Sequence, residues 1–176
     1  LSATRRDAQP HQRTLEASIR WSHDLLTDDE RVTFRRLAVF SGPFDPTDAV
    51  EVDGGHAHVV TAALDRLVEG SLLAASSDGR LLFLETVRAF AEDRLDESGE
   101  TSSVRDRHLV WVLARAEAIV PGFDGPEPAS AATTARRLLN DARAAIHHAE
   151  QTSQAAAIWQ LVGYLAPALQ RLWSRR

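Results

Sequence analysis

The stretch from Leu72 to Leu95 changes its hydrophobic period once, and this change limits the folds open to the chain. Leu72–Ala75 and Arg80–Leu84 are apolar runs of strand length. The SSDG segment between them tolerates the positive φ angles of a hairpin turn. From Glu85 the apolar residues recur every three or four positions, as in an amphipathic helix. Because a two-stranded hairpin is not stable alone in water, it must pack on helices.

The residues before the hairpin supply those helices. Thr27 and Glu30 have the spacing of a capping box, which opens a helix that runs to about Phe40. Asp45 as N-cap and Pro46 in the first turn open a short helix that ends at Gly54-Gly55. The other predicted helices are Thr14–Leu26 and His56–Glu69, preceded by a frayed segment up to Pro10. Three helices followed by a hairpin predict a winged helix, which we place at residues 12–98.

The second half is predicted to be all helical, so the fold class is mainly α. Its helices are Ser102–Ile119, Ala131–Gln151 and Ser153–Trp173, with a loop at Pro121–Pro128 because prolines and glycines crowd there. Pro167 should kink the last helix. These helical hairpins predict an α-solenoid-like domain at residues 102–176. The spacing of Trp159, Gly163 and Tyr164 does not fit the usual tetratricopeptide pattern, so the residues alone indicate only a repeat-like arrangement.

The last predicted helix has a wide apolar face. Its residues expected to point inward are Ile158, Leu161, Val162, Leu165, Leu169 and Leu172. Such a face could cover a further helix of a longer protein, or could pair two copies of the chain as a homodimer. The chain begins with Leu and has no Met, which indicates a segment of a longer protein.

Composition excludes several classes of site. The chain has no Cys, which excludes disulfides and thiolate metal sites and fits a reducing compartment. No apolar run approaches the roughly 20 residues that span a bilayer. We therefore expect a cytoplasmic protein with no membrane partner.

We expect no enzyme, metal site or cofactor in this segment. No GxxxxGK[ST] phosphate loop is present. The histidine pairs His56/His58 and His147/His148 lack a third ligand at the spacing of a metal site. The acidic cluster at Asp28–Glu30 is explained by the capping box and not by catalysis. The acidic residues from Asp45 to Asp53 lack the glycine and the glutamate of a calcium loop. The residues considered are His56, His58, His147 and His148; Asp28, Asp29 and Glu30; and Asp45, Asp48, Glu51 and Asp53.

Charge separates two uses of a winged helix. In a DNA-binding winged helix the helix before the wing, here His56–Glu69, enters the major groove. Between Phe44 and Glu97 there are twelve acidic and four basic residues, a net charge of −8, which opposes phosphate binding. We therefore favour a protein-docking winged helix and no nucleic-acid partner, with a DNA-binding transcription factor as the alternative. The candidate docking residues are three basic residues that we expect to be exposed, Arg66, Arg80 and Arg88.

Three segments carry a resemblance to a known family: RTLEASIRWSHDLLTDDERVTFRRLAVFSGPF, LDRLVEGSLL and RLLFLETVRAFAEDRL. They resemble the winged helix that follows the ATPase core in bacterial STAND (NB-ARC-type) regulators. LLNDARAAIHHA and LVGYLAPALQRLW resemble the first tetratricopeptide-like helices after it. The resemblance implies a signal-transduction module, which relays the nucleotide state of a separate ATPase domain to a helical arm that senses a protein effector. Regulation of transcription is the frequent output of such proteins, and the parent would bind ATP or ADP.

The resemblance also implies a nucleotide-sensing position. In the family, a Met-His-Asp motif where the wing enters the next helix contacts the β-phosphate of ADP. Phe83, Leu84 and Glu85 occupy that place here, so Leu84 replaces the sensing His. Leucine has no hydrogen-bond donor, and we expect no ATP or ADP affinity from this segment. If Leu84 is buried, Leu84→Ala should cost about 2–4 kcal/mol through lost packing.

Overall fold

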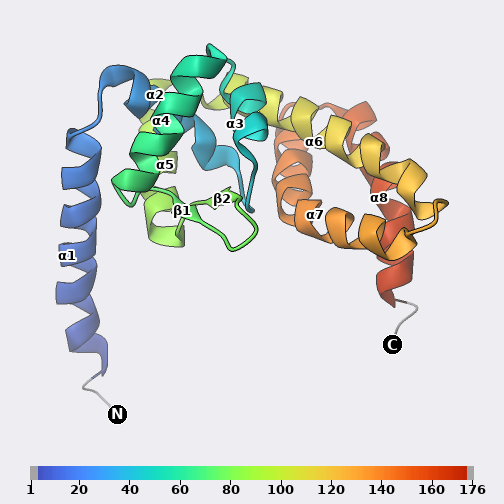
Figure 1. The fold of residues 1–176 in the computed structure, drawn as a ribbon, viewed down its shortest axis with the longest axis horizontal. Coiled ribbons are helices and arrows are strands. Elements are labelled where there is room, and N and C mark those ends of the chain that lie inside the picture. The colour runs from blue at the N-terminus through green and yellow to red at the C-terminus, as the bar shows by residue number, and fades with distance from the viewer. Residues whose placement is uncertain (1–3, 174–176) are drawn as a thin grey trace.

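The computed structural model describes residues 4–173, with side chains for residues 14–168 and for residue 170. Helices α1–α5 and a small sheet form one half, and α6–α8 form the other (Figure 1). The elements are α1 Thr4–Asp24, α2 Asp28–Arg36, the 3-10 helix η1 Leu37–Val39, α3 Pro46–Asp53, α4 Ala57–Glu69, β1 Ala74–Ala75, β2 Leu81–Leu82, α5 Glu85–Ser98, α6 Thr101–Phe123, α7 Pro128–Gln151 and α8 Ala155–Trp173. The predicted fold class, a winged helix followed by helical hairpins, is confirmed.

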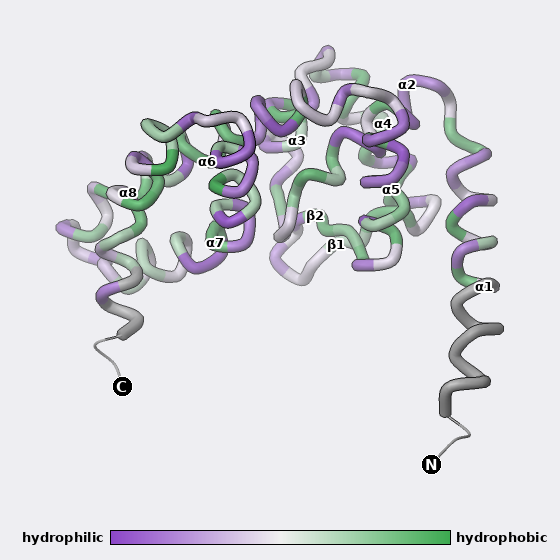
Figure 2. Tube along the Cα trace, turned by 180° about the vertical axis from the view of Figure 1, so that it is seen from behind, coloured by the Kyte–Doolittle hydropathy of each residue, from purple (hydrophilic) through white to green (hydrophobic). Residues whose placement is uncertain are grey.

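Helix α1 differs from its prediction. It begins at Thr4, not at Thr14, so the segment predicted to fray is helical where the structure describes it, and Leu1–Ala3 lie outside the described residues. The Arg, Ala and Gln residues of this segment are good helix formers. Of its apolar residues Ile19 is buried, whereas Leu15 and Trp21 are 47% and 66% exposed. Helix α1 therefore lies at the edge of the winged helix (Figure 2) and contacts it through Ile19 and His23.

The winged helix is built on local signals. Thr27 N–H donates to Glu30 Oε2 at 2.8 Å and Glu30 N–H donates to Thr27 Oγ1 at 3.4 Å, so the predicted capping box starts α2. Strand β1 pairs antiparallel with β2, and Phe44 joins Leu81 as a third, isolated bridge. Helices α2, α3 and α4 pack on one another beside this sheet.

The strands of the wing are shorter than predicted. The amides of Leu72 and Leu73 both donate to Leu67 O, at 2.8 and 3.1 Å. They thus complete the C-terminal end of α4 and are not available to a strand ladder. At the other end, Leu84 is already the N-cap of α5. Only two residues per strand remain in the ladder.

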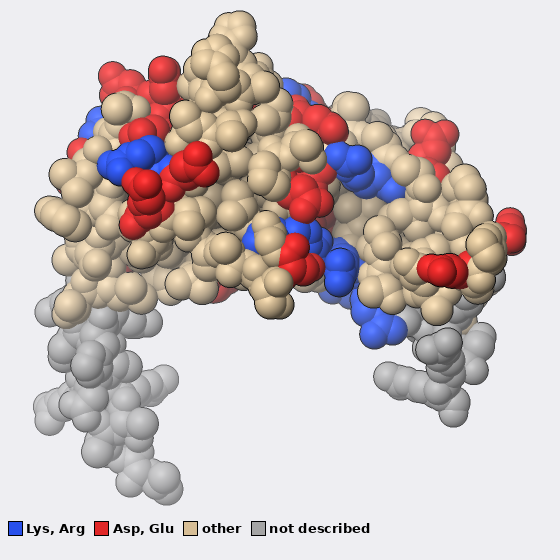
Figure 3. Space-filling view, in the orientation of Figure 1, with Lys and Arg blue, Asp and Glu red and all other residues tan. Residues whose placement is uncertain are grey.

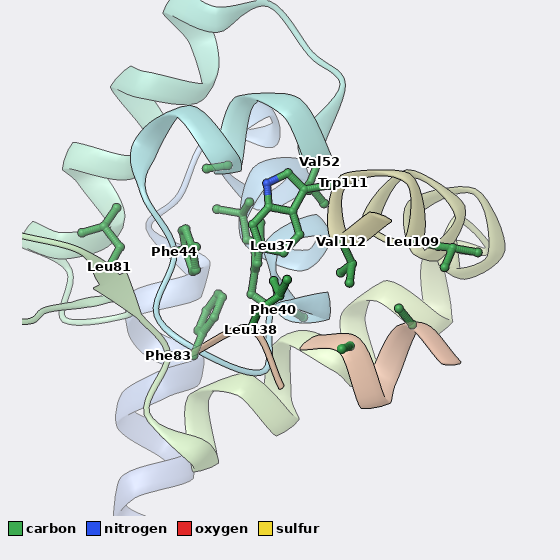
Figure 4. Close-up of a cluster of buried hydrophobic side chains, with 14 of the residues drawn as sticks. Leu37, Phe40, Phe44, Val52, Leu81, Phe83, Leu109, Trp111, Val112 and Leu138 are labelled. Carbon is green, nitrogen blue, oxygen red and sulfur yellow. The ribbon is translucent and has the colours of Figure 1, made fainter. Parts of the chain in front are cut away.

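The core runs continuously from one half into the other. Phe40 and Phe44, from the segment between α2 and α3, stack with ring centroids 4.3 Å apart. Trp111 of α6 meets the Phe40 ring edge-on at 5.1 Å, an arrangement that aromatic quadrupoles favour. Figure 4 shows these rings converging between the ribbons of α3 and α6. The helical arm therefore completes the core of the winged helix.

Two predictions about the helical arm need correction. Helix α6 continues through Pro121 to Phe123, and α7 starts at Pro128, so the loop is shorter than predicted. Pro121 lies in the last turn, where only one helical hydrogen bond is lost, and Pro128 is in the first turn, where its missing N–H costs nothing.

The predicted inward face of α8 is wrong at Val162, which is 44% exposed, whereas Leu161 and Leu165 are buried. Trp159 is 74% exposed. The side chains of Leu169 and Leu172 lie outside the described residues. Helix α8 continues through Pro167. Among the described residues, no helix has the length and hydrophobicity needed to cross a bilayer.

Candidate nucleic-acid interface and interdomain site

Helix α4 holds the position of a recognition helix. Gly54, at φ 76°, ends α3 in the left-handed conformation that glycine adopts readily. His56 is then the N-cap of α4. Val60, Ala63, Leu64 and Leu67 bury one face of α4, so the other face is open to solvent. The fold thus presents one side of the helix just before the wing.

The exposed face of α4 is divided by charge. Its first two turns carry His58 and Thr61, both exposed and neither acidic, and the His56 and His58 rings stack with centroids 5.9 Å apart. The acidic residues Asp65 and Glu69 lie in the second half of the helix. The N-terminal half of α4 therefore carries no carboxylate side chain of its own.

The three candidate docking arginines lie on three different elements. Only Arg66 of α4 has a largely exposed side chain, at 53%, and it pairs with Glu69 and with Glu30. Arg80, beside β2, donates to Asp78 Oδ2 at 3.2 Å and to Pro43 O at 3.2 Å. The expectation that all three are exposed is therefore wrong for Arg80, whose side chain is 18% exposed.

Arg88 is likewise partly buried. Its side chain, on α5, is 23% exposed and pairs with Glu85 and Glu92. Burial raises the pKa of Glu92 above its ordinary value, while the Arg88 charge opposes that rise. The described contacts bring no two of the candidate arginines together. Their role in docking stays a prediction.

Sequence reasoning missed a charged clamp where the two halves meet. Glu100, the second of the two residues between α5 and α6, accepts from Arg35 Nε at 2.9 Å and from an Arg36 guanidinium nitrogen at 2.6 Å. The hydrogen bond from Arg36 holds the pKa of Glu100 below its ordinary value, despite partial burial. These partners are more than 60 residues apart, so no local spacing signals them. The clamp fixes the start of α6 to α2.

Two further polar links cross the same junction. Arg107 of α6 donates to the carbonyl oxygens of Val52 and Asp53 at 2.7 and 3.0 Å. Asp141 of α7, 2% exposed, accepts from the Ser41 amide at 2.7 Å and lies 3.3 Å from His108 Nε2. Because buried carboxylates are costly unless paired, these contacts favour one arrangement of the halves.

The remaining candidates occupy structural roles. His147 is exposed, and His148 is buried against Asp106 at 2.7 Å. Within the described residues, no group of three or more potential ligands could hold a metal ion. The loss of packing expected for Leu84→Ala depended on burial of Leu84. Leu84 is 58% exposed, so that loss is not expected. It faces solvent because it precedes α5, whose first buried residue is Val87.

Comparison with known proteins defines the class to which this geometry belongs. Residues 26–96 match the family model of a winged helix-turn-helix domain. That span begins just before α2 and ends within α5, so it contains the capping box, α4 and the wing. The first half of the chain therefore has a winged-helix fold and is similar to winged helix-turn-helix domains.

Relatives extend the match over nearly the whole chain. "Putative HTH-type transcriptional regulator Rv0890c" of Mycobacterium tuberculosis is 36% identical over 177 residues, which cover 97% of this chain and 19% of that protein. "Uncharacterized protein Rv0894" of the same species is 34% identical over 104 residues, 55% of this chain and 26% of that protein. The chain thus spans about a fifth of the length of the regulator it resembles. No solved structure matches it.

The winged helix is therefore of the kind found in transcriptional regulators. The name of the first of these two relatives specifies a helix-turn-helix transcriptional regulator and mentions no ATPase. The narrower expectation, a STAND-type relay of nucleotide state, stays a prediction.

Proposed function

We propose that this chain serves transcription regulation, as the winged-helix segment of a longer regulator whose α4 and wing contact duplex DNA. The observation that carries the proposal is the open N-terminal half of α4, which has no acidic side chain. In helix-turn-helix proteins the N-terminal residues of the recognition helix reach the base edges. Here His58 is exposed at that end and can form hydrogen bonds. The exposed Thr61 hydroxyl, which donates to Ala57 O at 2.8 Å, can still accept one.

The charge that opposes DNA binding is distributed unevenly over the fold. Of the twelve acidic residues counted between Phe44 and Glu97, three lie from His56 to Arg80, together with two arginines. That segment, which holds α4, β1 and the turn of the wing, has a net charge of −1, and β2 adds no charge. The other acidic residues belong to α3, its N-cap and α5. The face presented to DNA is therefore nearly neutral, and binding should be weak and sensitive to salt.

Protein docking is the second candidate, and a specific observation favours it. The exposed Arg66 is paired with Glu69 and Glu30, and Arg80 is tied to Asp78 and Pro43, so few cations remain for phosphates. In this candidate the same face docks on another domain of the longer regulator. By the resemblance to STAND regulators, that domain would be an ATPase core that binds ATP or ADP.

Fluorescence anisotropy with a random 20-base-pair duplex at about 20 mM salt distinguishes the two candidates. If α4 contacts DNA, we expect a Kd on the order of 10–100 μM that weakens as salt rises. Arg66→Glu should abolish this binding, whereas the matched charge reversal Arg143→Glu, on the exposed surface of α7, should change it far less. No binding at 200 μM protein would reject DNA contact by this segment and leave protein docking.

A further inference from the structure

A cleft of about 420 Å³ lies where the two halves meet, enclosed by the wing, the start of α3, α6 and α7. Small-molecule sites have volumes of about 300–1,000 Å³ and are frequent at such junctions. Part of the wall is apolar, from Trp111, Ile119 and Leu138. Arginines from three elements, Arg80, Arg115 and Arg137, also line it. Figure 3 shows basic side chains gathered in the hollow between the halves.

Most charged groups of this cleft are already engaged. Asp48 accepts from Trp111 Nε1 at 3.0 Å and from Arg115 at 2.6 Å. Asp141 is held by the Ser41 amide and faces His108. Both carboxylates are buried. Both carboxylates therefore already have hydrogen-bond partners within the protein.

Arg137 is the least engaged of the three arginines, because it forms an ion pair with Asp78 but no hydrogen bond to a described residue. Its side chain is 53% exposed, and the described acidic group nearest to its guanidinium is Asp78 Oδ2 at 3.6 Å, beyond hydrogen-bond distance. Its guanidinium makes no hydrogen bond with the residues that the structure describes. By contrast, Arg80 and Arg115 each make hydrogen bonds to carboxylates. Arg137 thus offers a fork of donors that fits a carboxylate in the bidentate manner.

We propose that this cleft binds a small organic acid, with one carboxylate on Arg137 and an apolar body against Ile119 and Leu138. A single negative charge suits the site, because the exposed Asp45 also lines the cleft and would repel a polyanion. The proposal is independent of DNA contact. It adds an effector site between the wing and the helical arm.

Isothermal calorimetry with acetate, benzoate and 2-naphthoate tests the proposal on the whole chain without DNA. Affinity should rise along this series as more apolar surface is buried, with benzoate binding at about 1 mM or tighter. Benzamide, which has the same ring but no charge, should bind at least tenfold more weakly than benzoate. Equal affinities along the series, or no binding of 2-naphthoate at 10 mM, would overturn the proposal.

Variants locate the site. Arg137→Gln should weaken 2-naphthoate binding about tenfold or more. Arg136→Gln removes the same charge from the neighbouring exposed position, which does not line the cleft, and should leave the affinity within twofold. Equal losses in both variants would show non-specific charge attraction and overturn the proposal.

Two further variants test the geometry without removing Arg137. Asp45→Asn keeps a good N-cap for α3 but removes a like charge, so binding should tighten about twofold to fivefold. Ala118→Trp places an indole at an exposed lining position and should block 2-naphthoate. Circular dichroism of each variant confirms that it remains folded. Full binding by a folded Ala118→Trp variant would place the ligand elsewhere and reject this cleft.

Discussion

Trp111 of α6 donates its indole N–H to Asp48 Oδ1 of α3 at 3.0 Å, and both residues are buried. This hydrogen bond joins the helical arm to the winged helix through a charged acceptor. Asp48 Oδ2 also accepts from the Asp45 amide at 2.9 Å, which places the same carboxylate at the start of α3. Asp48 is therefore both a capping residue and a link between the halves.

Replacement of Asp48 should show how much this link contributes. We expect Asp48→Ala to lower the free energy of unfolding by about 2–3 kcal/mol, because it leaves buried donors unsatisfied. Glu51→Ala is the matched control, since Glu51 is exposed and also pairs with Arg115, and it should cost less than about 0.5 kcal/mol. Urea denaturation measures both. Similar values for the two variants would contradict a linking role for Asp48.

Leu84 and Phe83 provide a second test. Leu84→Ala should change the free energy of unfolding by less than about 0.5 kcal/mol, because the side chain is 58% exposed. Phe83→Ala, at a 9% exposed position beside the Phe34 ring, should cost about 3–4 kcal/mol. Thermal and urea unfolding of the two variants check this order. A loss of 2 kcal/mol or more in Leu84→Ala would restore the packing role expected from sequence.

The Glu100 clamp predicts a dependence on pH. The pKa of Glu100 is lowered from 4.5 in the folded chain, first by the hydrogen bond from Arg36. A lowered pKa means that its stabilisation is present above the unfolded value and is lost as pH falls through the folded value. Glu100→Gln should therefore destabilise by about 1–2 kcal/mol at pH 7. The difference in free energy of unfolding between this variant and the unmodified chain should become steadily smaller below pH 4.5. Urea denaturation at pH 7, 5, 4 and 3 measures it. A difference that stays constant over this range would contradict the clamp.

The division into two domains, residues 12–98 and 102–176, is still a prediction. Because the two halves share one core, we expect neither to be fully stable alone. A cut at Gly99 removes Trp111 and His108 from the Phe40 ring, which both residues cover in the intact chain. We expect residues 1–99 to fold with a lower melting temperature and to bind a hydrophobic dye. Residues 100–176 should aggregate or melt early. Two fragments as stable as the intact chain would show that the halves are independent.

Local signals in the sequence predicted much of the fold. The Thr27–Glu30 capping box, the Asp45-Pro46 start of α3 and the change of period at Glu85 each depend on residues within one or two turns. Such interactions leave a readable spacing. The winged-helix arrangement follows from their order along the chain.

Features that depend on distant partners could not be read in this way. The strand lengths were overestimated because Leu72 and Leu73 give their amides to Leu67 at the end of α4. The exposure of Arg80 was overestimated because its guanidinium donates a hydrogen bond to the carbonyl oxygen of Pro43, 37 residues away. In the cleft, the position of α7 relative to the wing determines which arginine is free to bind a ligand. No sequence pattern in either segment predicts that position.

The connection between the halves consists of Gly99, at φ 74°, and Glu100. A short link with a glycine would ordinarily serve as a hinge. Here the second linker residue is itself held by Arg35 and Arg36, so bending at this point requires the clamp to open first. A displacement of α7 or α8 should therefore move α4 with it as long as the clamp is closed. The two halves would then move as one rigid body, and high ionic strength or protonation of Glu100 would loosen the connection between them.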